Sequence, residues 1–192
     1  MWLLVHGFGT WDGGKGTFSS LVSLLEQYKV DYQHVSYPFN FTLNTEEAIE
    51  AILKIAQPGC KILAHSNGCT AAYECAFLHD LWIKHLIMAA PPLDPGLMFP
   101  ATIEAVDICW NRGDRIVDPA NVWRTLNDVV LNRKRTVVAF GTMGRKGPMG
   151  TSKRIQGHPF HKTVRHSGYF QGVHAKRILG LMEPQLRGEL LI

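Results

Sequence analysis

The sequence has no long apolar run, and this absence bears on where the protein resides. No apolar stretch reaches the ~20 residues that a membrane-spanning helix needs, so we expect no membrane span. The first residues, Met-Trp-Leu-Leu-Val, lack both the basic region and the small-residue cleavage site of a secretory signal peptide. We therefore expect a cytoplasmic protein.

Cysteines are few and do not occur in metal-binding or disulfide patterns. The four of them lie in or beside expected strands and helices, not in loops: Cys60, Cys69, Cys75 and Cys109. This placement is typical of buried free thiols in a reducing compartment. The sequence contains neither paired cysteines nor an H-E-x-x-H motif to accompany its nine histidines. We expect no metal and no cofactor.

Acidic residues are missing from one long segment. From Val129 to Met182 there are eleven Lys or Arg and no Asp or Glu, so the net charge of +4 combines +11 here with −7 elsewhere. We expect this segment to attract anionic substrates or surfaces, although a solvated basic face that only maintains solubility is the alternative. Specific nucleic-acid binding is not expected, because a reading motif is lacking and, apart from Tyr169 and Phe170 beside the base, aromatic residues are not interleaved with the basic ones. The sequence does not indicate an oligomeric state.

What the sequence does contain is an alternation of strand-like and helix-like segments. The 192 residues are 46% hydrophobic and show no internal repeat or linker, which predicts one globular domain over 1–192. The alternation predicts an α/β fold with a mostly parallel sheet covered by helices on both faces. We expect strands at about 2–6, 31–36, 60–65, 84–89, 104–110 and 135–141, and helices at about 16–28, 45–56, 67–78, 119–131 and 174–182.

The stretch 60–73 has the pattern of a nucleophile elbow. An apolar strand runs into His-Ser-Asn-Gly at 65–68 and continues as small, helix-compatible residues. At such an elbow a serine, here Ser66, sits on a sharp turn, and the N–H groups that open the helix point toward its hydroxyl. The turn requires small neighbours, and Ala64 and Gly68 supply them. Taken alone, so short a pattern also fits an ordinary strand-to-helix turn.

A second motif at the start of the chain favours the catalytic interpretation. The first strand ends in His-Gly-Phe-Gly at 6–9. An acyl-transfer site needs two backbone donors for the oxyanion, one from the residue after the nucleophile and one from the loop after a neighbouring strand. Asn67 and Phe8 are the residues expected in those positions. If the elbow were absent, Gly7 and Gly9 would indicate only the end of a strand.

With these two motifs the chain resembles the α/β-hydrolase superfamily, and the resemblance extends over nearly the whole length. It implies a three-layer sandwich with a six-stranded sheet in the order 2-1-3-4-5-6 and the active site at the carboxyl ends of the strands. Compared with a full-size hydrolase, we expect the first two strands and the large helical lid to be lacking. The resemblance also implies that an acid and a histidine follow the serine in the chain.

The acid expected from this order is Asp114. It follows an apolar strand within 103–119, as in the superfamily's acid loop. Asp118 is the alternative, but it directly precedes Pro119 and an amphipathic stretch, which is typical of a helix N-cap. Asp107 falls inside the strand pattern and is expected to be structural.

The histidine expected to act as the base is His166. The segment His-Ser-Gly-Tyr-Phe at 166–170 resembles the histidine loop of the superfamily, in which a small residue and an aromatic residue follow the base. His174 begins the last helix pattern and is expected to lie on the surface or in the first turn. His158 and His161 flank Pro-Phe in an irregular loop, where they are candidates for substrate contact.

Two further segments differ from the larger hydrolases. The short, proline-rich stretch 89–100 is unable to form a helical cap, and we expect its apolar residues, with Tyr169, to line an acyl pocket: Leu93, Leu97, Met98 and Phe99. Packing of these side chains against the sheet edge is the alternative. Residues 142–165 combine four glycines with six basic residues, so we expect a mobile basic loop inserted before the histidine.

Together these features predict a small serine esterase that acts on a carboxylic ester or related acyl substrate, with anionic substrates among the candidates. Ser66 is the expected nucleophile, His166 the base and Asp114 its orienting acid, and the N–H groups of Phe8 and Asn67 form the oxyanion hole. Hydrolysis of a thioester, an amide or an anionic polymer, or acyl transfer, would need the same residues. The alternative from another class is a non-catalytic module of the same fold that binds a ligand or a partner protein.

Overall fold

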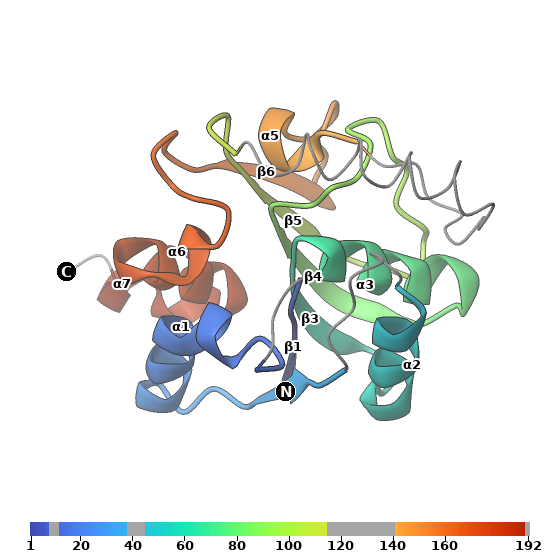
Figure 1. The fold of residues 1–192 in the computed structure, drawn as a ribbon, viewed down its shortest axis with the longest axis horizontal. Helices are drawn as coiled ribbons and strands as arrows, with labels where there is room; N and C mark the ends of the chain where they lie inside the picture. Colours follow the sequence, from blue (N-terminus) through green and yellow to red (C-terminus); the bar gives the residue numbers. More distant parts are fainter. Residues whose placement is uncertain (8–11, 38–44, 115–140, 191–192) are drawn as a thin grey trace.

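A computed structural model describes residues 1–7, 12–37, 45–114 and 141–190 of the chain. Its core is a six-stranded parallel sheet in the order β2-β1-β3-β4-β5-β6 (Figure 1). The strands are β1 (Trp2–Val5), β2 (Tyr32–Val35), β3 (Cys60–His65), β4 (Ile83–Ala89), β5 (Val106–Trp110) and β6 (Ile155–Pro159). The expected α/β class and strand order are therefore confirmed.

Helices cover both faces of this sheet, as Figure 1 shows. Helices α1 and α6 lie on one side and α2 and α3 on the other, and α5, α7 and two short 3-10 turns complete the described elements. The helix bounds are α1 (Lys15–Gln27), α2 (Glu46–Ile55), α3 (Asn67–Leu78), α5 (Met143–Lys146), α6 (Gly172–Met182) and α7 (Arg187–Leu190). None of these helices is long and apolar enough to cross a membrane.

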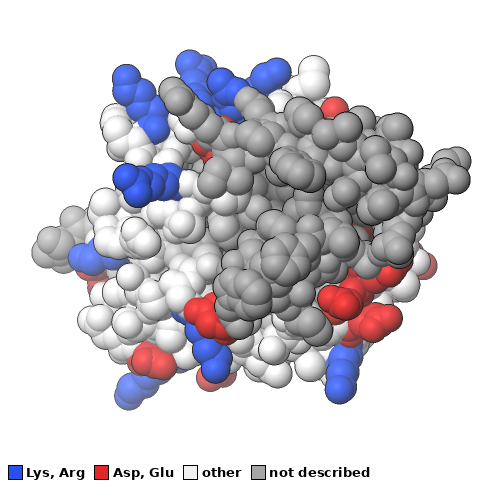
Figure 2. Space-filling view, viewed as in Figure 1, with Lys and Arg blue, Asp and Glu red and all other residues white. Residues whose placement is uncertain are grey.

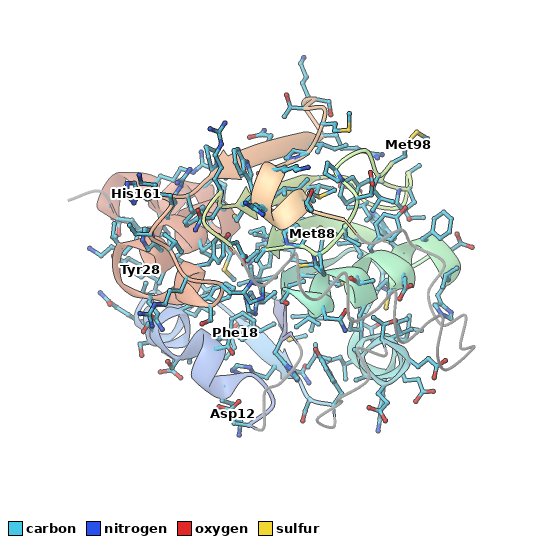
Figure 3. All side chains as sticks on the ribbon, turned by 45° about the horizontal axis from the view of Figure 1, so that its top comes forward. Asp12, Phe18, Tyr28, Met88, Met98 and His161 are labelled. Atoms are coloured by element: carbon cyan, nitrogen blue, oxygen red, sulfur yellow. The ribbon has the colours of Figure 1, made fainter. Side chains whose placement is uncertain are left out.

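The alternation of side chains along the strands separates the core into two layers. Leu3 and Val5 of β1 point into the layer below α2 and α3, whereas Trp2 and Leu4 point into the layer below α1 and α6. Phe18 of α1 is fully buried in the second layer, and Figure 3 labels it there. Strands buried on both faces are typical of parallel sheets between helices, which explains why β1 and β3 are almost wholly apolar.

The sixth strand differs from its prediction. We expected a strand at 135–141, of which residues 135–140 lie outside the described residues and Gly141 is not in a strand. Instead, the segment 142–165, predicted to be a loop insertion, contains α5 and also β6, which pairs in parallel with β5. The sequence of β6, Ile-Gln-Gly-His-Pro, includes glycine and proline, both of which are depleted in strands and tolerated at sheet edges. Pairing with β5 rather than local propensity therefore accounts for this strand.

Candidate active site

Ser66 occupies a sharp turn between β3 and α3, as the elbow pattern predicts. Its backbone has φ 52° and ψ −126°, a positive-φ conformation that non-glycine residues rarely adopt. Strained backbone of this kind persists only where the surrounding structure holds it, and it occurs preferentially at functional sites. The Ser66 amide donates to the Ala89 carbonyl, which fixes the turn to the end of β4.

Two glycines allow β1 to end directly against this turn. A Cβ on Gly68 would lie 2.4 Å from the His6 carbonyl oxygen, and a Cβ on Gly7 would lie 2.7 Å from Cβ of Ser66. Neither gap can hold a side chain, because the nearest atoms belong to the backbone or to the serine itself. Asn67, the expected oxyanion donor, is the first residue of α3, whereas Phe8, the other one, lies outside the described residues.

The structure brings the side chains of Ser66, His166 and Asp114 together in one hydrogen-bonded row. His166 Nε2 lies 2.8 Å from Ser66 Oγ, and His166 Nδ1 lies 2.8 Å from Asp114 Oδ2. The Asp114 side chain is completely buried and that of His166 is 12% exposed. A buried acid fixes the tautomer and orientation of the imidazole, leaving Nε2 free to exchange a proton with the hydroxyl.

A set of contacts that the sequence analysis did not identify joins the turn of the acid to the segment that precedes the base. The Asn111 amide group donates to the Val164 carbonyl, while its side-chain oxygen accepts from Gly113 at 2.8 Å. Gly113 itself passes so close to the Lys162 carbonyl oxygen that a Cβ there would lie 2.0 Å away. Asn111 and Gly113 therefore set the distance between Asp114 and the base.

His65, which the sequence analysis considered only as part of the elbow, also contacts the base. Its Nε2 donates to the His166 carbonyl oxygen at 2.9 Å, and its ring lies 4.9 Å from the His166 ring and 5.4 Å from Phe170. Burial, with a smaller contribution from His166, lowers the pKa of His65 to about 3. His65 is therefore a neutral donor near pH 7 that holds the backbone of the histidine loop.

The residues predicted to line an acyl pocket are mostly part of the core. Leu93 is fully buried and Phe99 is 7% exposed, and both belong to the layer below α2 and α3, with Leu97 packed against it. Tyr169 is also fully buried, with its ring 5.0 Å from that of Phe160. Met98, in contrast, is 84% exposed and points away from the molecule (Figure 3). Packing against the sheet, the alternative interpretation, therefore describes Leu93 and Phe99.

The alternatives to these residues in the sequence are Asp107, Asp118 and His174. Asp107 of β5 accepts hydrogen bonds from His85 at 2.6 Å and from His158 at 2.5 Å, which gives it the structural role expected. Although burial acts in the opposite direction, these two bonds lower the pKa of Asp107 to about 2. His174 lies in the first turn of α6, as predicted, and Asp118 lies outside the described residues.

No protein-family model and no curated protein sequence matches this chain, but its fold is similar to that of many solved structures. A monoacylglycerol lipase from Paleococcus ferrophilus aligns with a TM-score of 0.59 at 14% identity, over 96% of this chain and 93% of the lipase. A methylesterase from Arabidopsis aligns with a TM-score of 0.56 at 13% identity, over 96% of this chain and 98% of the methylesterase. An esterase from Pyrobaculum calidifontis aligns with a TM-score of 0.56 at 10% identity, over all of this chain and 76% of the esterase. The chain therefore has the α/β-hydrolase fold.

Proposed function

We propose that this protein is a serine hydrolase that cleaves carboxylic esters through an acyl-enzyme intermediate. The observation that carries the proposal is the continuous row of hydrogen bonds from Asp114 through His166 to Ser66, with the serine on a strained elbow. A hydroxyl is a weak nucleophile near neutral pH, and a base oriented by a third group is the arrangement that activates it. A protein that only binds a ligand does not need a serine, a histidine and an acid joined by hydrogen bonds in this way.

In the proposed reaction, Ser66 Oγ attacks the ester carbonyl carbon while His166 Nε2 takes the hydroxyl proton. The negative charge that develops on the carbonyl oxygen is stabilised by the N–H of Asn67 at the start of α3, with Phe8 as the second expected donor. His166 then gives its proton to the alkoxide, so that the alcohol leaves and the acyl group stays on Ser66. Water attacks this acyl-enzyme by the same steps in reverse and releases the carboxylic acid.

The choice of esters as the substrate class rests on the similar structures, and the preference for anionic esters rests on charge. The lipase, the methylesterase and the esterase with the same fold are all named for ester substrates. Arg165 and Lys162 are exposed just before the base, and Arg112 is exposed just before Asp114. We therefore propose that esters carrying a negative charge are preferred, because a positive rim raises their local concentration.

Turnover of short-chain p-nitrophenyl esters tests this proposal, with wild type compared to Ser66→Ala and His166→Ala. Both variants should lose at least about 10³-fold in kcat, as expected for members of a triad. Ser23→Ala, an exposed serine on α1, and His79→Ala, an exposed histidine after α3, should retain wild-type rates. Wild-type turnover by Ser66→Ala, or a folded wild type without activity on any ester, would contradict the proposal.

A further inference from the structure

A separate cavity of about 530 Å³ lies on the α6 side of the molecule, and the proposed reaction does not use it. Neither Ser66, Asp114 nor His166 lines it. Its walls come from β6, the segment after β6, α6 and α7, and His161, labelled in Figure 3, lies at this side. The lining residues are Gln156, His158, His161, Val173, His174, Lys176, Arg177, Gly180, Leu181, Arg187 and Leu190. A volume in this range is typical of sites for small molecules.

The charged side chains of this cavity all have one sign. Lys176, Arg177 and Arg187 line it together with three histidines, and among the described lining residues none is acidic. Elsewhere on the face that Figure 2 shows, Lys and Arg also gather along the upper edge of the molecule, and acidic residues lie mainly below. His158 is paired with Asp107 of β5, so Lys176, Arg177 and Arg187 are the groups that can provide the complement of an anion.

Two of these cations are held in place before any ligand arrives. Arg177 donates through Nη1 to the Pro159 carbonyl at 2.8 Å and lies 4.4 Å above the Phe160 ring, while Arg187 donates through Nε to the Gly180 carbonyl at 2.8 Å. Each guanidinium has five N–H donors, so both retain donors for a ligand. Side chains fixed in this way lose less conformational freedom on binding than free ones.

The positive charge also affects the histidine beside it. Burial lowers the pKa of His174, and Arg177 and His161 lower it further by repulsion. Other parts of the wall are apolar, since Leu181 and Leu190 are buried and Val173 adds an exposed apolar side chain. The cavity thus combines a cationic part with an apolar part.

We propose that this cavity binds a small organic anion with an apolar chain, the acidic head against Arg177, Arg187 and Lys176 and the chain against Leu181 and Leu190. A fatty carboxylate and an alkyl phosphate share this chemistry. The site is distinct from the proposed hydrolase site and does not depend on its activity. An anion without an apolar chain would contact only the cationic part of the cavity, and an uncharged alcohol would contact only its apolar part.

Histidine ring signals in ¹H–¹³C NMR spectra report binding directly, because His161 and His174 line the cavity. We expect saturable shifts with octanoate or octyl phosphate, and binding at least about tenfold weaker for octanol and for acetate, since charge-assisted hydrogen bonds or apolar burial are lost. Binding of only one of the two amphiphiles would identify the head group. Octanol binding as tightly as both anions, or the absence of saturable shifts with either anion, would overturn the proposal.

Three substitutions at exposed positions test the location of the site. Val173→Glu places a negative charge at the cavity and should weaken octanoate binding at least about tenfold, whereas Val173→Gln, similar in size, should weaken it much less. Lys153→Glu changes the charge at an exposed residue of the same basic segment that does not line the cavity, and it should leave binding unchanged. Equal weakening by Val173→Glu and Lys153→Glu would show diffuse surface attraction and contradict the proposal. Ser66→Ala should bind normally, which separates this test from that of the hydrolase.

Discussion

Replacing His65 with glutamine should make the protein less sensitive to acid. The pKa of His65 is about 3 in the folded protein, against an ordinary value of 6.5, because the buried ring loses hydration on protonation. Between these two pH values the unfolded chain binds one more proton than the folded chain at this site. The stabilising effect of the neutral ring is therefore complete above pH 6.5 and is lost as the pH falls toward 3.

The size of the effect follows from the pKa shift. Well inside this window each pH unit changes the free energy of unfolding by about 1.4 kcal/mol, and the slope is smaller near pH 6.5, where the unfolded histidine is only half protonated. Lowering the pH from 6.5 to 4.5 therefore removes about 2 kcal/mol through His65. Glutamine does not titrate, yet its amide can donate to the His166 carbonyl as the ring does. The other histidines with lowered pKa are present in both proteins, so their contributions cancel in the comparison.

Urea denaturation at pH 7.5, 6.5, 5.5 and 4.5 measures this difference. Between pH 6.5 and 4.5, His65→Gln should lose about 2 kcal/mol less free energy of unfolding than wild type, whatever its stability at pH 7.5. His79→Gln, which replaces an exposed histidine, should follow the wild-type curve. Parallel curves for wild type and His65→Gln would refute the reasoning, since they would mean that His65 titrates normally in the folded protein.

Two further predictions concern the positioning of the nucleophile and of the base. Asp114→Asn should fold but lower kcat on p-nitrophenyl esters by a factor on the order of 10³–10⁴, because the amide favours the wrong tautomer of His166. An unchanged kcat would show that Asp114 does not orient the base. Gly68→Ala would place a methyl group against the backbone of β1, so the elbow must shift. We expect the free energy of unfolding to fall by about 1–3 kcal/mol, as for other overpacked sites, and kcat to fall as well. Urea denaturation and ester turnover measure the two quantities. Wild-type values of both would contradict this account.

Most of the central elements could be predicted because their sequences are locally consistent. The apolar strands β1, β3 and β4 and helix α3 lie within two residues of the predicted bounds. The order serine, acid, histidine, together with the resemblance of the segments around Asp114 and His166 to the superfamily's acid and histidine loops, selected three groups that lie within hydrogen-bonding distance. These features are predictable because buried parallel strands consist of apolar runs, and because the turn at Ser66 accepts few residue types.

Other features depend on contacts between distant segments. Strand β6 contains Gly157 and Pro159 and forms only through pairing with β5. The support of the base by His65 joins residues 101 positions apart, and no local pattern indicates it. Similarly, apolar side chains in a loop suit a pocket and a core equally well, which is why Leu93 and Phe99 were expected to contact substrate.

The central claim is that Ser66 is a nucleophile activated by His166, and labelling with a fluorophosphonate tests it most directly. Intact mass and peptide mapping would be compared for wild type, Ser66→Ala, His166→Ala and the exposed-site control Ser23→Ala. Single labelling of wild type and Ser23→Ala on Ser66, with no label on Ser66→Ala and strongly reduced labelling of His166→Ala, is the predicted result. A folded wild type that remains unlabelled, or a label on a residue other than Ser66, would contradict the account.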